Sequence, residues 1–337
     1  MVVRLYNENE RQQARNLIEI SGLRFEENFD VLFGIFEDGN LVATGARERN
    51  ILKMLCIRED YQGGAFLAEL LTELLNTAAH TGYQSFFIFT KPEHSHSFQQ
   101  FNFTPLVSHH QVCLLESGNG LKRYLEKHQD LARSGKNGAV VVNCNPFTLG
   151  HRYLIEIAAD QVDHLYVFVV REDCSIFPFD IRYRLICEGT ADLPNVSILD
   201  TSDYAISSIT FPSYFLKPDK DVQSLQMEID LILFGKQIAP FFNIHKRFIG
   251  TEPYCRTTRI YSETMHQIMA PFNVETVQLE RKKYKDQVIS AFRVREALKK
   301  EAFETLKDLV PETTLRFLRT REGRELRARL LDYQRRH

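Results

Sequence analysis

Gly138 to Asp160 reads GAVVVNCNPFTLGHRYLIEIAAD, and this stretch predicts how the second half of the chain folds. It opens with residues 139–142, a short apolar run rich in β-branched side chains that is typical of a buried strand in a parallel sheet. It closes with apolar residues at helical spacing, namely Tyr153, Leu154, Ile157 and Ala158. The tight turn between them, residues 145–151, brings its side chains to the carboxyl edge of the sheet, where the first N–H groups of the helix gather partial positive charge. We therefore predict a phosphate site at this turn.

Two side chains of the turn have the chemistry that such a site needs. Thr148 and His151 place a hydroxyl and an imidazole on the first turn of the helix, and Gly150 leaves room for a ligand near the backbone. The imidazole can donate to a phosphate oxygen and stabilise charge that builds on phosphorus during substitution. A simpler interpretation is that His151 only caps a helix. The strand, the Asn-Pro turn and the helix together favour the functional interpretation.

The segment Thr148-Leu149-Gly150-His151 resembles the (H/T)-x-G-H signature of the nucleotidyltransferase superfamily. The resemblance implies that ATP is a substrate, that its α-phosphorus is attacked and that pyrophosphate leaves. It also implies that the nucleotide is bound by residues of the turn, namely Asn145, Pro146, Phe147, Thr148 and His151.

Composition describes an ordinary globular protein of two domains. The chain has 337 residues, 44% of them hydrophobic and 26% charged, with a formal net charge of -2. The charge gives no reason to expect nucleic acid or a membrane as partner, and no apolar segment is long enough to predict secretion or membrane spanning. The six cysteines lack C-x-x-C spacing, so we expect no metal site or disulfide framework and a reducing, cytoplasmic location.

The first third of the chain predicts an α+β domain. A hairpin is expected over 31–45, a strand over 51–57, a glycine turn at Gln62-Gly63-Gly64-Ala65, a helix over 66–79 and a strand over 85–90. This order resembles the GNAT-type acetyltransferase fold, in which the glycine turn offers backbone amides to coenzyme A. The resemblance implies that Gln62, Gly63, Gly64 and Ala65 bind a CoA-like group. A turn that only needs glycine for its backbone conformation remains an alternative.

From residue 138 onward, strands and helices alternate, which predicts an α/β domain with a Rossmann-like parallel sheet and its ligands at the carboxyl ends of the strands. Strands are expected over 165–170, 196–199, 247–250 and 273–278, and helices over 180–189, 227–239 and 258–269. We therefore divide the chain into a GNAT-like domain over 1–116, a connector over 117–137, a nucleotidyltransferase domain over 138–310 and a charged C-terminal helix over 311–337.

Three further features fall at the predicted carboxyl edge. Arg182 and Arg184 open a helix, either toward a ligand or as solvated charges. Gly250 is followed by Glu252, which could accept from a ribose hydroxyl or an adenine amine or simply belong to a turn. A basic run of Arg281, Lys282, Lys283 and Lys285 would attract a triphosphate, although a solvated charge run needs no function.

The segment Ile289-Ser290-Ala291-Phe292-Arg293-Val294-Arg295 places Ser290 as the N-cap of a helix. It resembles the second superfamily signature, I-S-(S/A)-(S/T)-x-(I/V)-R, which grips the β- and γ-phosphates. The resemblance implies that Ser290 and Arg295 hold the leaving pyrophosphate. Phe292 stands where the signature has Ser or Thr.

Longer segments make the chain similar to the citrate lyase ligase family, in both sequence and domain order. They are FPFDIRYRL at 177–185, DYAISS at 203–208, TFPSYFLK at 210–217 and GTEP at 250–253. The resemblance implies that acetate and ATP acetylate the prosthetic-group thiol of the citrate lyase acyl carrier subunit, giving AMP and pyrophosphate through an acetyl-adenylate. It assigns catalysis to Thr148, His151 and Arg295, a phosphate contact to Lys217, and Mg²⁺ to the triphosphate itself, so that no protein metal ligands are expected.

Two alternatives remain from the residues alone. The second domain could be a small-molecule adenylyltransferase, or the protein could be an acetyl-CoA-dependent acetyltransferase with a nucleotide-sensing domain. Dependence of pyrophosphate release on acetate separates these three functions.

Overall fold

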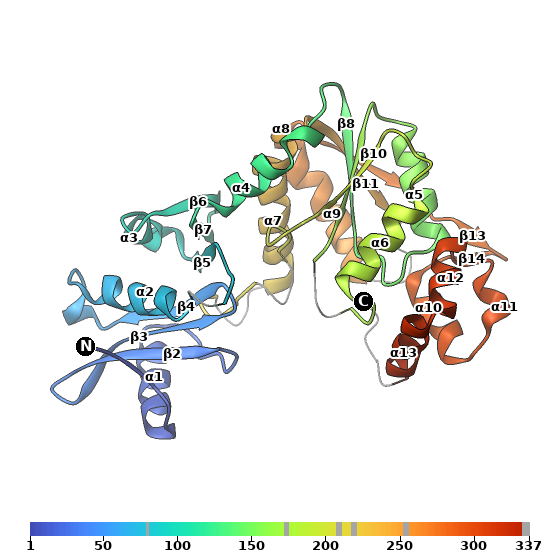
Figure 1. Ribbon diagram of the computed structural model, residues 1–337. Coiled ribbons are helices and arrows are strands. Elements are labelled where there is room, and N and C mark those ends of the chain that lie inside the picture. The colour runs from blue at the N-terminus through green and yellow to red at the C-terminus, as the bar shows by residue number, and fades with distance from the viewer. Residues whose placement is uncertain (79–80, 172–174, 207–210, 217–220, 252–255, 332–337) are drawn as a thin grey trace. The chain divides into compact units, whose positions relative to one another are not determined.

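The computed structural model describes the chain except for residues 79–80, 172–174, 207–210, 217–220, 252–255 and 332–337 (Figure 1). It forms two compact units, one of Met1–Glu126 with Ile206–Ile229 and the other of Lys127–Ala205 with Asp230–His337. The sequence predicted one boundary near residues 117–137 and an uninterrupted second domain over 138–310. Residues 206–229 depart from that division, because this stretch from the second half packs in the first unit.

The first unit is built on a mixed sheet with strand order β1-β2-β3-β4-β5-β7-β6. Its strands are β1 (Val2–Arg4), β2 (Val31–Glu37), β3 (Asn40–Glu48), β4 (Ile51–Ile57), β5 (Phe86–Thr90), β6 (Phe103–Ser108) and β7 (Cys113–Ser117). Its helices include α1 (Glu8–Ile20), α2 (Phe66–Asn76), α3 (Ser95–Gln99) and α4 (Gly120–Lys127). An Asn7–Glu10 capping box begins α1. Leu70, Leu71 and Leu74 of α2 are buried in the core that covers the sheet.

Strands β4 and β5 are parallel and pair only at their first residues. The paired positions are Ile51 with Phe87 and Leu52 with Ile88. Beyond them β4 continues to Ile57, and Met54 adopts a positive φ of 54°. The two strands separate there, and a glycine turn leads from β4 into α2. This is the arrangement of the acetyltransferase fold that the sequence resembles, so the predicted GNAT-like fold is confirmed.

The second unit contains a five-stranded parallel sheet with strand order β10-β9-β8-β11-β12. These strands are β8 (Asn137–Val142), β9 (Leu165–Val169), β10 (Val196–Asp200), β11 (Ile244–Gly250) and β12 (Glu275–Leu279). The helices between them are α5 (Leu149–Ala159), α6 (Phe179–Gly189), α8 (Ala239–Phe241) and α9 (Arg256–Met269). Helix α7 (Val222–Leu233) also falls between β10 and β11 in the sequence, but its residues up to Ile229 belong to the first unit. The predicted α/β fold is therefore confirmed.

The strand order contains a point at which the direction of winding reverses. From β8 the chain adds β9 and β10 on one side, and it then returns to add β11 and β12 on the other. Ligands of open parallel sheets bind beyond the carboxyl ends of the two strands that flank such a point. In this unit those strands are β8, which leads into α5, and β11, which ends at Gly250.

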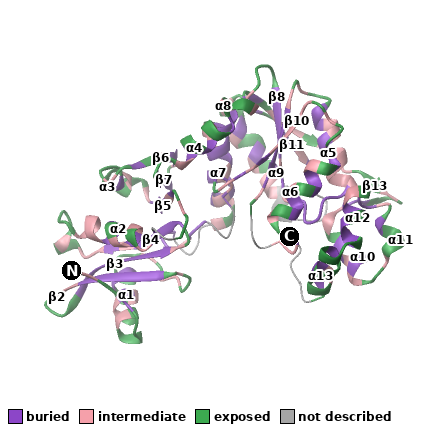
Figure 2. Cartoon of the chain, in the orientation of Figure 1, coloured by how far each residue is buried: buried purple, intermediate pink, exposed green. Residues whose placement is uncertain are grey.

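The chain after β12 forms a hairpin and a helical C-terminal region. These elements are β13 (Lys283–Tyr284), β14 (Gln287–Val288), α10 (Ala291–Lys299), α11 (Phe303–Leu306), α12 (Glu312–Arg319) and α13 (Arg321–Leu330). The expected single charged helix is two helices, because Thr320 ends α12 and its hydroxyl caps α13 by accepting from the Gly323 amide. The predicted apolar stripe packs on the core of the second unit through Leu315, Leu318, Leu326 and Leu330 (Figure 2).

The helices that the structure describes are all too short or too polar to cross a membrane. The cysteines at positions 56, 113, 144 and 187 carry free thiols. Cys174 and Cys255 lie outside the described residues.

Candidate active site

The turn between β8 and α5 is organised around the side chains of Thr148 and His151. Thr148 is the N-cap of α5, and its hydroxyl accepts from the His151 amide at 3.2 Å. In return the Thr148 amide donates to Nδ1 of His151 at 3.1 Å. The imidazole is thereby held in one orientation by the first turn of its own helix.

This hydrogen bond identifies the tautomer of His151. Because a backbone amide can only donate, Nδ1 must be an acceptor, and the proton of the neutral ring is on Nε2. Burial, and secondarily the positive charge of Arg281, lower the pKa of His151 to about 3. The ring is therefore a neutral N–H donor at physiological pH, suited to hydrogen-bond an anionic oxygen without giving up its proton.

We predict that the His151 ring does not titrate between pH 8 and pH 5. Its native pKa lies below the ordinary value of 6.5. Below about pH 6.5 the imidazole is therefore protonated in the unfolded state and still neutral in the native state. The free energy of unfolding consequently decreases as the pH falls from about 6.5 toward 3. Nitrogen-15 NMR of the histidine side chains should show a neutral ring protonated at Nε2 throughout. An imidazolium signal from His151 at pH 6 would contradict the assignment.

Other groups of the turn pack against or hydrogen-bond to the protein itself, whereas the sequence predicted that they contact the ligand directly. Thr148 is completely buried, so its hydroxyl supports the histidine. Phe147 is also buried; it packs on Gly189, and its carbonyl accepts from Thr314. The Leu149 amide donates to the Leu309 carbonyl at 2.9 Å. The helix start therefore offers fewer amides than a bare N-terminus, and the imidazole is its main donor.

The second signature lies directly against the first. Ser290 is the N-cap of α10, as predicted, and accepts from the Arg293 amide at 3.3 Å. A Cβ added to Gly150 would lie 2.6 Å from the carbonyl oxygen of Ile289, the residue before this cap. Gly150 is thus required for the approach of Ile289, where the sequence suggested room for a ligand. The two helix starts are joined through backbone contact.

Arg295 makes a second connection between the two signatures. It is almost fully buried, and its Nη1 donates to the Asn145 carbonyl at 2.6 Å. Asn145 itself accepts at Oδ1 from the Phe177 amide at 3.1 Å. Among the described atoms, its buried Nδ2 has no hydrogen-bond partner. A buried donor of this kind, next to a ligand site, suits a ligand oxygen.

Arg281 also belongs to this site. The sequence had indicated it only as one of four basic residues at positions 281–285. It follows β12, and its Nε lies 3.3 Å from where a Cβ on Gly250 would be. Its charge also reaches His151. By contrast, Lys282 lies 5.9 Å from the centre of the Tyr153 ring. Of the residues in that run, Arg281 therefore lies against Gly250 at the end of β11, and its charge acts on His151.

The remaining predictions for this edge divide into three outcomes. Arg182 is fully buried and donates to the carbonyls of Phe177, Asn143 and Val170, so it joins the ends of β8 and β9 within the fold. Arg184 is exposed and pairs with Glu322 at 3.3 Å. Lys217 and Glu252 lie outside the described residues.

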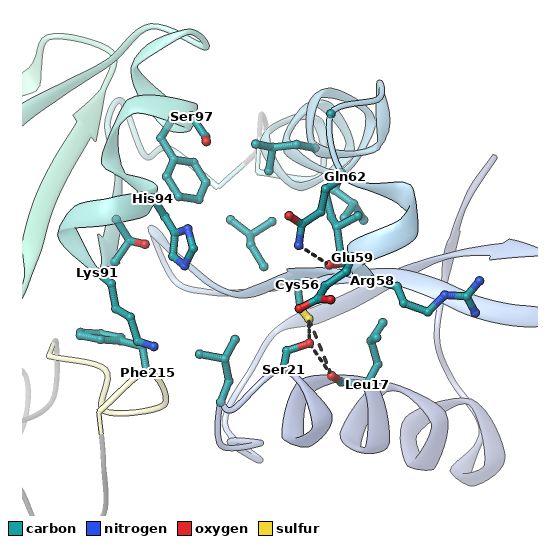
Figure 3. Close-up of a pocket in the computed structure, with 18 of the residues that line it drawn as sticks. Leu17, Ser21, Cys56, Arg58, Glu59, Gln62, Lys91, His94, Ser97 and Phe215 are labelled. Carbon is teal, nitrogen blue, oxygen red and sulfur yellow. Dashed lines mark hydrogen bonds between the residues drawn. The ribbon is translucent and has the colours of Figure 1, made fainter.

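The first unit contains a cavity of about 990 Å³ at the separated ends of β4 and β5. Gln62, Gly63 and Gly64 of the predicted turn line it, whereas Ala65 is the N-cap residue of α2. Lys91 and His94 project from the side opposite Gln62 and Glu59 (Figure 3). At its base, Cys56 lies 2.8 Å from the Ser21 hydroxyl, and burial raises the pKa of this thiol. Both apolar and polar side chains therefore line the cavity.

Fold and site together define a class of protein. A parallel sheet presents two adjoining helix starts, a neutral histidine and a guanidinium at its reversal of winding, and this is a nucleotide-binding domain of the nucleotidyltransferase type. In the part of the chain that the structure describes, no three metal-binding side chains gather into a cluster.

Comparisons with known proteins identify the family. The model of the citrate lyase ligase C-terminal domain matches residues 137–318. The citrate pro-3S-lyase ligase of Escherichia coli (strain K12) is 37% identical over 329 residues, which cover 93% of each chain. That of Klebsiella pneumoniae is 40% identical over 285 residues, 82% of this chain and 83% of the relative. The chain therefore belongs to the citrate lyase ligase family, which is a family of enzymes.

A solved structure also resembles part of the chain. Thermotoga maritima TmcAL bound with alpha-thio ATP aligns with a TM-score of 0.37 and 14% sequence identity, over 57% of each chain.

Proposed function

We propose that this protein uses ATP and acetate to acetylate the prosthetic-group thiol of the acyl carrier subunit of citrate lyase. Membership of the citrate lyase ligase family supports this function over the two alternatives left open by the residues. The structural observation that carries it is the neutral His151, which Thr148 fixes and on which the charge of Arg281 acts, at the reversal of winding. The protein is proposed to work in the cytoplasm.

In the first step an acetate oxygen attacks the α-phosphorus, and the bond from that phosphorus to the pyrophosphate oxygen breaks. The proposed role of His151 is to donate from Nε2 to an α-phosphate oxygen as negative charge grows there. Thr148 is a positioning residue for that ring. Asn145 Nδ2 supplies a second donor. Mg²⁺, carried mainly by the triphosphate oxygens, would supply charge neutralisation.

Ser290 and Arg295 are proposed to form the pyrophosphate end of the site. Ser290 stands at the start of α10, where partial positive charge favours an anion. Arg295 holds the Asn145 carbonyl, so it keeps the two helix starts in register. We assign Arg295 mainly this positioning role, since its guanidinium is buried beneath the turn.

In the second step the carrier thiol attacks the acetyl carbon, the bond to AMP breaks, and the thiol proton passes to solvent or to a nearby base. The proposed receptor of the CoA-like arm is the cavity of the first unit. Gln62, Gly63 and Gly64 line one side of it, and the free edge of β4 borders it. Such an edge offers amide and carbonyl groups to the amides of the arm.

The decisive experiment for this function is isotope exchange between pyrophosphate and ATP. We expect the exchange between pyrophosphate and ATP to require acetate. We also expect the enzyme to acetylate the thiol carrier and to release AMP. Exchange without acetate, or acetyl transfer from acetyl-CoA without ATP consumption, would overturn the proposal.

Arg281 leads to a prediction with a built-in control. Replacing Arg281 with Ala should lower acetate-dependent exchange by about tenfold to a hundredfold, because a positioned cation is lost from the phosphate site. The positive charge of Arg281 lowers the pKa of His151. In the Arg281→Ala variant, NMR should therefore measure a higher His151 pKa.

Lys282→Ala is the matched control for Arg281→Ala. It removes the neighbouring positive charge, which lies over the Tyr153 ring. If both variants lose the same activity, the effect is one of general basicity, and the specific role of Arg281 is wrong.

A further inference from the structure

Residues 211–216, with the sequence Phe-Pro-Ser-Tyr-Phe-Leu, come from the second half of the chain but are part of the first unit. They follow β10 of the nucleotide-binding sheet and precede α7. The aromatic and leucine side chains of this segment are buried, namely Phe211, Tyr214, Phe215 and Leu216. The segment was one basis of the family resemblance, yet the adenylation chemistry gives it no role.

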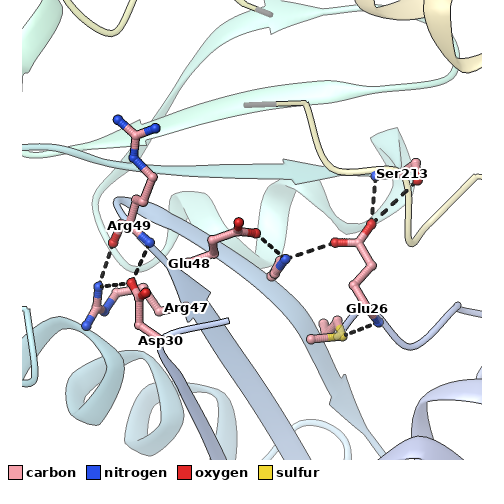
Figure 4. A network of polar contacts seen from close by, with 8 residues as sticks. Glu26, Asp30, Arg47, Glu48, Arg49 and Ser213 are labelled. Atoms are coloured by element: carbon pink, nitrogen blue, oxygen red, sulfur yellow. Dashed lines mark hydrogen bonds and ion pairs between the residues drawn. The ribbon is translucent and has the colours of Figure 1, made fainter. Parts of the chain in front are cut away.

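An ion pair network anchors one end of the segment. The Ser213 amide donates to Oε1 of Glu26 at 3.0 Å, and Oε2 of Glu26 accepts from Lys53 at 3.0 Å (Figure 4). Lys53 is almost completely buried and also pairs with Glu48 at 2.5 Å. Two carboxylates thus neutralise one buried ammonium, and one of them uses its second oxygen to hold Ser213.

Tyr214 and its neighbours fasten the segment to Arg24, which follows α1, and to Phe89 of β5. The Tyr214 hydroxyl donates to the Phe89 carbonyl of β5 at 3.1 Å. The Arg24 amide donates to the Tyr214 carbonyl at 2.7 Å. Phe211 meets Phe89 edge to face, with ring centroids 5.3 Å apart. These bonds fix the backbone of the segment on the first unit.

Tyr214 and Phe215 then complete the lining of the cavity. Figure 3 shows Phe215 beside Lys91, on the side of the cavity away from Gln62. Residues 1–126 alone would lack this side. Removing those residues would in turn uncover the apolar side chains of 211–216, so a simple truncation cannot separate the two functions.

We propose that residues 211–216 are the acceptor-recognition wall, with Phe215 positioning the pantetheine-type arm of the thiol acceptor. This inference rests on the proposed function and assigns its acceptor specificity. The wall is aromatic, which suits the methyl and methylene groups of such an arm, while Gln62, Thr90 and Ser97 offer partners for its amides. The first unit is therefore completed by a segment that lies between β10 and α7 in the sequence.

A fluorescence titration tests this directly, because the chain contains no tryptophan. Phe215→Trp would be the sole indole in the protein, and pantetheine or phosphopantetheine should shift or quench its emission in a saturable manner. Phe303→Trp is the control, since Phe303 is 38% exposed, belongs to the second unit and does not line the cavity. Saturable change only at position 215 supports the wall. Equal or absent changes at both positions overturn it.

A kinetic test uses the acceptor dependence of thiol acetylation. Phe215→Ala should raise the KM for the acceptor by about tenfold, the loss expected for one aromatic contact of ~1.4 kcal/mol. Phe303→Ala should leave that KM unchanged. If Phe215→Ala does not fold, Phe215→Leu retains most of the apolar volume and should raise KM by a smaller factor in the same direction.

The two proposals fail in different ways. If the natural protein shows no acetate-dependent exchange between pyrophosphate and ATP, the proposed function itself is wrong. If exchange occurs but neither Phe215 variant changes acceptor KM, and the indole does not respond to the probe, only the acceptor-recognition wall is wrong.

Discussion

Replacing His151 with Ala is expected to lower acetate-dependent exchange between pyrophosphate and ATP by about 10² to 10³, the range for loss of one donor that stabilises transition-state charge. The imidazole is neutral and donates from Nε2, because the Thr148 amide occupies Nδ1 at 3.1 Å. The backbone cap of α5 should survive, since Thr148 still accepts from the amide of residue 151. The Thr148 amide loses its acceptor, so we expect a modest fall in unfolding temperature and a much larger fall in turnover.

Exchange rates at saturating ATP and acetate measure this effect. His266→Ala is the matched control, because His266 is an exposed histidine in the last turn of α9 and should leave the rate unaltered. Weaker ATP binding with normal turnover of the saturated enzyme would show that His151 binds the ground state without acting on the transition state.

Replacing Gly150 with Ala is the second change with a large expected effect. The new Cβ would lie 2.6 Å from the Ile289 carbonyl oxygen, and neither backbone can yield without moving a helix start. We expect a loss of about 1–3 kcal/mol in the free energy of unfolding, typical of overpacking. We also expect a fall of roughly 10² in exchange rate, because a misplacement of about 1 Å disrupts alignment of the reacting groups.

Chemical denaturation and exchange assays on the same preparations measure the two losses. Gly64→Ala is the control for stability, since a Cβ there meets only the Tyr61 carbonyl oxygen, at 3.8 Å. Wild-type stability and activity in Gly150→Ala would mean that the two signatures do not depend on this approach.

Both changes probe the same physical arrangement. His151 supplies the donor, and the contact of Gly150 with Ile289 sets where α10 begins relative to that donor. Arg295 adds a second connection between the two helix starts, because its guanidinium donates to the Asn145 carbonyl. We therefore expect activity to depend on the register of two helix starts that are far apart in sequence.

Local patterns were enough to predict much of the fold. The hairpin of β2 and β3, the strand at β8 and the helix start at Thr148 each depend on neighbouring residues, so periodicity and capping residues reveal them. Ser290 was recognised as an N-cap for the same reason. The roles of buried residues were harder to predict. Arg182 looks like a surface charge in sequence, and only the positions of three distant carbonyls make it internal.

By itself, the sequence determined the order of strands and helices, the helix starts at Thr148 and Ser290, and the family, because these depend on residues close together in the chain or on direct similarity. Tertiary structure alone decided that Gly150 receives the Ile289 backbone, that the charge of Arg281 acts on His151, and that Tyr214 and Phe215 line the cavity of the first unit. The reason is physical: local propensity acts over a few residues, whereas packing and electrostatic contact join groups that the chain separates by tens or hundreds of positions.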